Sequence, residues 1–101
     1  MNGVTAYRCE ACGWQGFPHR FWCPRCGGAG VSDILVEAGS VEETTTARRL
    51  PGHEGGPVRL ATVLLDGGGR VIVRLDTAST GPRVRLRTED GAFIAHDMQH
   101  A

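Results

Sequence analysis

The stretch of sequence that decides the fold runs from residue 9 to residue 28 and reads CEACGWQGFPHRFWCPRCGG. It holds all four cysteines of the chain, Cys9, Cys12, Cys23 and Cys26, as two C-x-x-C motifs separated by ten residues. A glycine follows each motif directly, and glycine accepts the tight turn that lets backbone N–H groups point at sulfur. This pattern predicts a zinc ribbon, in which four thiolates surround one structural Zn²⁺ and leave no open position for water.

Other uses of the four cysteines are less consistent with this pattern. Iron in the same cage stays an alternative, because geometry alone does not separate it from zinc. A redox C-x-x-C normally stands alone at the start of a helix in a βαβ setting, which this sequence lacks. Disulfides would suit an exported protein, but residues 1–6 have neither the basic nor the apolar segment of a secretory signal. We therefore expect a cytoplasmic protein, and no apolar run is long enough to span a membrane.

Aromatic residues gather around the cysteine motifs. Five of the six lie within or beside them: Tyr7, Trp14, Phe17, Phe21 and Trp22. A small ribbon has little aliphatic core, so Tyr7 and one tryptophan are expected to pack around the metal site. Four rings between the two motifs exceed what one metal site covers, so we expect Trp14, Phe17, Phe21 and Trp22 to bind a partner protein.

Beyond Gly30 the sequence has the short alternating segments of β structure. Strands are expected over residues 31–38, 41–47, 58–65, 70–75, 83–87 and 92–95, with a bulge or kink at Gly39-Ser40 and a hairpin turn over 66–69. No stretch has a convincing helical period. The predicted fold class is all-β: a zinc ribbon over residues 1–30, then a five-stranded OB-fold-like barrel with a short C-terminal tail over residues 31–101.

Charge and residue types exclude several functions. Eleven basic residues, all arginine, balance eleven acidic ones, so the net charge is zero and lysine chemistry is ruled out. Neutrality argues against a protein whose main task is to bind nucleic acid, which usually needs a basic excess. All cysteines are assigned to metal, and none of the four histidines has a second ligand or carboxylate at a metal-binding spacing. We expect no catalytic residues.

One stripe of charge stands out in the second half of the chain. Arg83, Arg85 and Arg87 alternate with apolar residues along a predicted strand. Three guanidinium groups on one face are suited to phosphates, either of nucleic acid or of coenzyme A. The alternative is an edge strand whose charges prevent pairing with another sheet.

The sequence resembles the small zinc-ribbon plus OB-fold proteins that associate with thiolases and other acyl-CoA enzymes. The matching segments are Tyr7-x-Cys9-x-x-Cys12-Gly13, Phe17-Pro18-x-Arg20-x-x-Cys23-Pro24-x-Cys26-Gly27, Gly39-x-Val41-x-x-x-Thr45, Pro57, Ala61-x-Val63-x-Leu65-Asp66-Gly67 and Gly81-x-x-Val84. The Phe-Pro-x-Arg link between the motifs is the most specific of these, because many zinc ribbons share the motifs themselves.

This resemblance implies a non-catalytic accessory subunit of a hetero-oligomer, with the reactive residues on a thiolase-fold partner and with CoA or acyl-CoA at the interface. The chain is similar to the small subunits of benzoylsuccinyl-CoA-type thiolases, which act in anaerobic breakdown of aromatic compounds. Many members carry a helical segment before the ribbon, whereas eight residues precede Cys9 here. We therefore expect the 17–22 segment to take over docking.

A rival function is a single-stranded nucleic-acid-binding module, because zinc ribbons and OB-folds both occur in such proteins and bases stack on their aromatic residues. The neutral charge argues against it, as does the single aromatic residue, Phe93, in the barrel segment. A rubredoxin-like electron carrier is a third alternative, and it requires iron.

Overall fold

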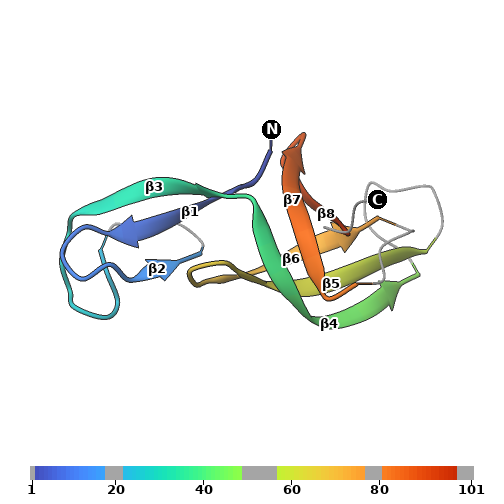
Figure 1. Ribbon diagram of the computed structural model, residues 1–101, viewed down its shortest axis with the longest axis horizontal. Coiled ribbons are helices and arrows are strands. Elements are labelled where there is room, and N and C mark those ends of the chain that lie inside the picture. The colour runs from blue at the N-terminus through green and yellow to red at the C-terminus, as the bar shows by residue number, and fades with distance from the viewer. Residues whose placement is uncertain (1, 18–21, 49–56, 77–80, 98–101) are drawn as a thin grey trace.

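The computed structural model describes residues 2–17, 22–48, 57–76 and 81–97, which form eight β-strands and no helix. The strands are β1 (Val4–Cys9), β2 (Gln15–Gly16), β3 (Val31–Val36), β4 (Ala38–Ala47), β5 (Val58–Leu65), β6 (Arg70–Leu75), β7 (Arg83–Glu89) and β8 (Ala92–Asp97). They make a three-stranded sheet with the order β2-β1-β3 and a closed barrel with the order β4-β5-β6-β8-β7 (Figure 1). The all-β prediction and the five-stranded barrel are confirmed. Within these ranges no helix is long and apolar enough to cross a membrane.

The ribbon sheet is built around β1. This strand pairs antiparallel with β3 from Val4↔Val36 to Cys9↔Val31, and with the short β2 at Tyr7↔Gly16. The first strand after Gly30 thus belongs to the ribbon sheet, which extends past the boundary expected at residue 30. The first barrel strand is β4.

The barrel has the strand order of an OB-fold, with one parallel contact, between β6 and β8, in an otherwise antiparallel arrangement. Alternate residues of β6 point inward, as the sequence predicts, and Val71, Val73 and Leu75 are all buried. The hairpin expected at 66–69 joins β5 to β6 and is closed by a hydrogen bond from the Leu65 N–H to the Gly69 carbonyl (2.8 Å).

The irregularity predicted at Gly39-Ser40 lies elsewhere. Strand structure is interrupted at Glu37, between β3 and β4, and the register of β4 against β5 shifts between Val41 and Glu43. Gly39 is itself a regular strand residue. Close packing requires a glycine at this position, because a Cβ there would lie 2.6 Å from the Leu64 carbonyl oxygen on the neighbouring strand.

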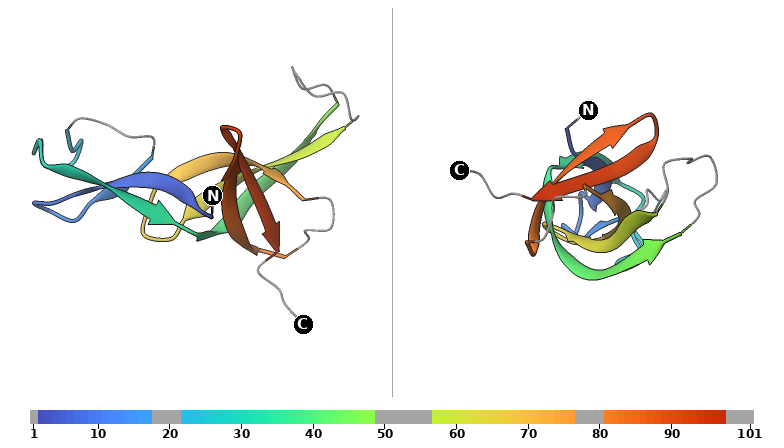
Figure 2. Two further views of the ribbon diagram at one scale, coloured as in Figure 1. Left: turned by 90° about the horizontal axis from the view of Figure 1, so that it is seen from above. Right: turned by 90° about the vertical axis from the view of Figure 1, so that its right-hand side faces the viewer.

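The ribbon and the barrel lie end to end (Figures 1 and 2) and share one apolar core. The radius of gyration of 14.6 Å exceeds the value of about 13 Å typical of a compact chain of this length. Val4, Ala6 and Val36 from the ribbon sheet join the buried cluster of the barrel. The Gly3 N–H also donates to the Leu86 carbonyl of β7 (2.8 Å), so the two parts are connected by backbone as well as by side chains.

Candidate metal centre and partner-binding surface

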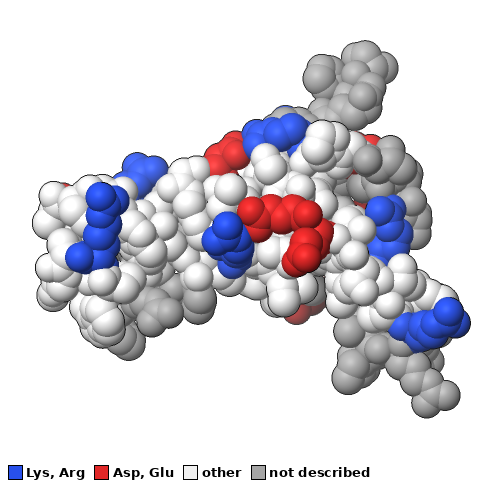
Figure 3. Space-filling view, turned by 90° about the horizontal axis from the view of Figure 1, so that it is seen from below, with Lys and Arg blue, Asp and Glu red and all other residues white. Residues whose placement is uncertain are grey.

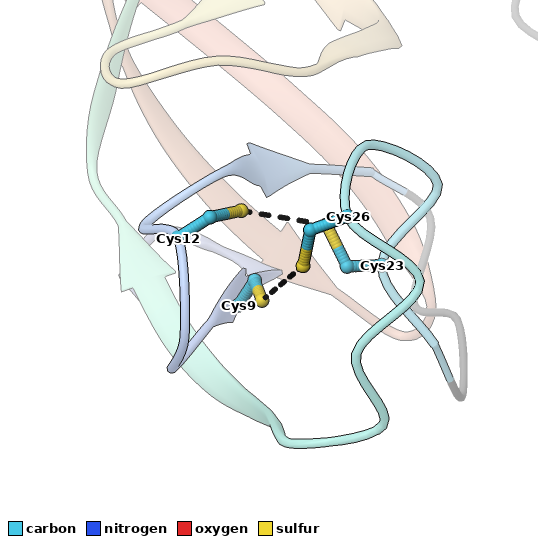
Figure 4. A group of neighbouring side chains, drawn as sticks. All are labelled: Cys9, Cys12, Cys23 and Cys26. Atoms are coloured by element: carbon cyan, nitrogen blue, oxygen red, sulfur yellow. Dashed lines mark hydrogen bonds between the residues drawn. The ribbon is translucent and has the colours of Figure 1, made fainter.

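The structure brings the four cysteine sulfurs together at one end of the ribbon (Figure 4). All four Sγ atoms lie within 4.8 Å of one another, with 3.6 Å between Cys9 and Cys26 and 3.7 Å between Cys12 and Cys23. A tetrahedral ion with metal–sulfur bonds of about 2.3 Å holds its sulfurs about 3.8 Å apart. A disulfide would require about 2.05 Å. The four residues therefore fit a tetrahedral metal ion, and zinc suits this set of ligands.

The two cysteine motifs have the same backbone geometry. In each, the N–H of the first cysteine donates to the carbonyl five residues later, and the N–H of the trailing glycine donates to the backbone carbonyl of the first cysteine. These bonds are Cys9–Trp14 (2.7 Å) and Gly13–Cys9 (2.9 Å) in the first motif, and Cys23–Gly28 (2.8 Å) and Gly27–Cys23 (2.8 Å) in the second. The two trailing glycines have φ values of 79° and 78°, in the left-handed region that favours glycine. Each sequence motif thus encodes one turn of the metal cage.

The pKa values of Cys9 and Cys26 are shifted in opposite directions. The Cys12 N–H does most to lower the pKa of Cys9, which falls to about 7. At Cys26 the Gly28 N–H lowers the pKa, but hydrogen bonds with the neighbouring thiols raise it by more, to about 11. A divalent cation in the cage would stabilise all four thiolates. Because four sulfurs complete the tetrahedron, such an ion would have no open position for a substrate.

The predicted partner-binding aromatics divide into two groups. Trp14 and Phe17 are half-buried and have ring partners within the chain: Trp14 lies 5.5 Å from Tyr7, and Phe17 lies 5.5 Å from Phe93, measured between ring centroids. Trp22, by contrast, is 52% exposed. The fourth predicted residue, Phe21, lies outside the described residues. Trp22 is thus the most exposed aromatic residue in the described part of the chain.

The arginines of β7 also differ from one another. All three point outward, because Val84 and Leu86 between them are buried. Arg83 binds both carboxylate oxygens of Asp66 (2.7 and 2.8 Å), and these hydrogen bonds hold the pKa of Asp66 below its usual value. Arg87 is bound to Glu89 (2.6 Å) and contacts Nδ1 of His96 (3.3 Å). Arg85 is exposed and forms no ion pair with any described residue.

The edge-strand alternative for this arginine stripe is wrong. In the closed barrel, β7 has a neighbour on each side, β4 and β8, so its charges protect no open edge. On the face shown in Figure 3, acidic and arginine side chains stand next to one another and no continuous basic surface forms. In the barrel, Phe93 packs against Phe17 rather than standing free to stack on a base.

Two features of the described residues had no signal in the sequence. Gln15, which is 5% exposed, joins the ribbon to the 66–69 hairpin through partners more than fifty residues away. A groove of about 270 Å³ also lies across β4, β5 and β6. The described residues hold one histidine, His96, and its contact is the arginine named above, so they assemble no pairing of nucleophile and base.

No protein-family model matches the chain, and neither does any curated protein. Several solved structures are similar to it, and two of them are described here. One is an Ltp2-ChsH2(DUF35) aldolase, with a TM-score of 0.73 and 22% identity over 93% of this chain and 84% of that one. The other is a protein of unknown function from the DUF35 family of Sulfolobus solfataricus, with a TM-score of 0.66 and 17% identity over 93% of this chain and 75% of that one. At these identities the likeness establishes a shared fold.

Proposed function

We propose that this chain is a non-catalytic accessory subunit of a thiolase-type acyl-CoA enzyme, and that it docks to a thiolase-fold catalytic subunit in the cytoplasm. The observation that carries the proposal is the fold. One of the similar structures is an aldolase whose name joins a DUF35 protein to a second protein. The Phe17-Pro18-x-Arg20 link supports the same function through its resemblance to acyl-CoA-associated proteins.

A structural zinc fits this role. The cage of Cys9, Cys12, Cys23 and Cys26 closes around one ion, so the metal would hold the ribbon in shape rather than act on a substrate. The metal cage would also fix the position of a docking residue, because Trp22 comes immediately before Cys23 in the second cysteine motif. A tryptophan that is half exposed on a rigid turn is a typical anchor of a protein interface.

We propose that Trp22 is the central docking residue and that Phe21 adjoins it. Trp14 and Phe17 are already held in place within the chain, since their rings pack on Tyr7 and Phe93. Preorganisation of this kind lowers the entropy lost on binding.

Contact with CoA is the second part of the proposal. Among the three arginines of β7, Arg85 is the best candidate for a CoA phosphate, because Arg83 is neutralised by Asp66 and Arg87 is bound to Glu89. The likeness to the small subunits of benzoylsuccinyl-CoA-type thiolases supports a substrate from anaerobic breakdown of aromatic compounds.

The test is to purify the chain alone and together with the thiolase-fold protein encoded beside it, and to measure acyl-CoA thiolysis by each preparation. We expect the two chains to co-purify and the activity to require both. Full activity of the large subunit alone, without co-purification, would contradict the proposal. Salt-sensitive, micromolar binding of a single-stranded oligonucleotide would instead support the nucleic-acid alternative.

The CoA contact is tested in the same complex with Arg85→Gln, and with Arg83→Gln as the matched control on the same strand. We expect Arg85→Gln to raise the KM for acyl-CoA by about tenfold, as the loss of one charge-assisted phosphate contact would do. The control is expected to change KM much less. Equal KM values for the unmodified complex and the Arg85→Gln complex would remove Arg85 from the CoA site.

A further inference from the structure

A second surface of the barrel is distinct from the ribbon and has an apolar centre. The strand registers place two rows of side chains across β4, β5 and β6 in the orders Glu43–Thr62–Ile72 and Thr45–Leu60–Arg74. These side chains point outward, since Ala61 between Leu60 and Thr62 on β5 and Val73 between Ile72 and Arg74 on β6 are buried. We call these six residues the outer barrel face.

This face has a large exposed aliphatic side chain, Ile72. Ile72 is 67% exposed, above Trp22 at 52% and Leu35 at 51% among the exposed large hydrophobic residues of the described ranges. It borders the groove of about 270 Å³ that crosses the three strands. Leu60 lies half-buried in the same groove. An exposed aliphatic residue beside a hollow is a surface that another protein can cover.

Opposite charges border the apolar centre. Glu43 lies on the β4 side, and Arg74 lies on the β6 side, where Arg70 is the next outward arginine. Arg70 is bound to Glu42 (2.7 Å), whereas Glu43 and Arg74 form no ion pair with any described residue. Figure 3 shows acidic side chains gathered near the middle of one side of the molecule, with arginines beside them. The face is thus acidic along one border and basic along the other.

We propose that the outer barrel face is a contact surface between two copies of this chain. In a two-fold dimer the axis lies in the plane of contact. An axis parallel to β5 sets β4 of each copy over β6 of the other, so that Glu43 lies over Ile72 of the second copy, between its Arg70 and Arg74. An axis perpendicular to β5 sets β4 over β4 and brings like charges together. Charge complementarity selects the first arrangement.

The dimer is expected to be weak. Three short strands give a contact smaller than the roughly 1,200 Å² of total buried area that marks a stable interface. We expect a dissociation constant on the order of 100 μM, which corresponds to about 5.5 kcal/mol of binding free energy. Because Trp22 lies on the ribbon, a copy bound at the barrel leaves the proposed docking residue accessible, and the proposal does not depend on the proposed function.

The experiment is sedimentation velocity of the full, metal-loaded chain over a range of concentrations. We expect reversible association, which Ile72→Arg weakens by at least about tenfold and Ile72→Thr weakens less, since threonine keeps the branched shape. Leu35→Thr is the matched control, because it removes a similarly exposed aliphatic residue from the ribbon sheet. A monomer at every concentration would overturn the proposal, and so would association that Leu35→Thr weakens and Ile72→Arg does not.

Charge reversal tests the orientation. Glu43→Arg should weaken association, because it sets an arginine between Arg70 and Arg74 of the other copy. The double variant Glu43→Arg with Arg74→Glu should restore it, and circular dichroism shows whether each variant is folded. Loss of association with Ile72→Arg but not with Glu43→Arg would overturn the axis parallel to β5.

Discussion

The Nε2 group of Gln15 donates hydrogen bonds to the backbone carbonyl of Asp66 (2.8 Å) and to that of Gly68 (3.0 Å). Its Oε1 accepts a hydrogen bond from Arg8 (3.0 Å), so both ends of this buried amide are used. The 66–69 hairpin fits closely around it: a Cβ on Gly68 would lie 2.8 Å from the Gln15 carbonyl oxygen. One side chain of the ribbon thus holds the barrel in a fixed orientation.

Replacement of this amide should destabilise the whole chain. We expect Gln15→Leu to lower the free energy of unfolding by about 1–3 kcal/mol, because it leaves two carbonyls without their donors near the junction. Denaturant unfolding measures the effect. Arg8→Ala is the comparison, since it removes only the donor to Oε1 and leaves both bonds to the hairpin in place, so it should cost less than Gln15→Leu. Identical midpoints for Gln15→Leu and the unmodified chain would show that the junction does not depend on Gln15.

Removal of the metal should unfold the ribbon. In so small a module the binding free energy of the ion is largely folding free energy, so Cys23→Ser or a chelator should lower the melting temperature markedly. Thiols must lose protons to bind the ion, so affinity should fall as the pH falls. Metal analysis of the purified chain checks the identity of the ion: a colourless protein with zinc supports a structural site, and a coloured one with iron contradicts it. Retained thermal stability in Cys23→Ser would exclude a structural role.

Two tryptophans should respond differently to truncation. Trp14→Ala should destabilise the ribbon by about 2–4 kcal/mol, because its half-buried ring packs on Tyr7. Trp22→Ala should leave the melting temperature nearly unchanged and weaken binding of the catalytic partner by at least about 2 kcal/mol. Thermal melts and a pull-down with the partner separate the two effects. If Trp22→Ala bound the partner normally, docking would have to occur on another surface.

The ion pair between Asp66 and Arg83 should make stability depend on pH. Arg83 lowers the pKa of Asp66 in the folded chain, so the folded state favours the ionised carboxylate more than the unfolded state does. The contribution is therefore full above the unfolded pKa of about 3.9 and is lost as the pH falls through the lower folded value. Both side chains are about half exposed, so the effect is small. The difference in unfolding free energy between the unmodified chain and Arg83→Gln, measured from neutral to acid pH, should shrink only below the unfolded pKa. A difference that stays constant down to the most acid pH would exclude this linkage.

Local patterns predicted the metal cage and the strands after Gly30, but not β1 or β2, and contacts distant in sequence decided how the strands pair. The C-x-x-C-G motifs predict both turns of the metal cage, and the alternation in 70–75 and 83–87 predicts two barrel strands, because each signal lies within a few residues. The partner of β3 was not predictable, since its alternation fits a barrel strand as well as a ribbon strand. Nor was the difference between Arg83 and Arg85, because the side chain that neutralises Arg83 lies 17 residues away. The ring contact of Phe17 was not predictable either, because its partner, Phe93, lies in the last strand.

The contact of the first residues with β7 has a consequence for the order of folding during synthesis. Residues 4–36 contain the whole ribbon sheet and all four cysteines, so every residue that would hold a metal ion is synthesised once β3 has left the ribosome. The N-terminal segment, however, reaches its final place only when Leu86 and Thr88 are available, because Gly3 bonds to both of them. The barrel would then be completed against a ribbon sheet whose strands are already synthesised. A nascent chain that lacks its last two strands would hold its metal while the apolar side of β1 is still uncovered.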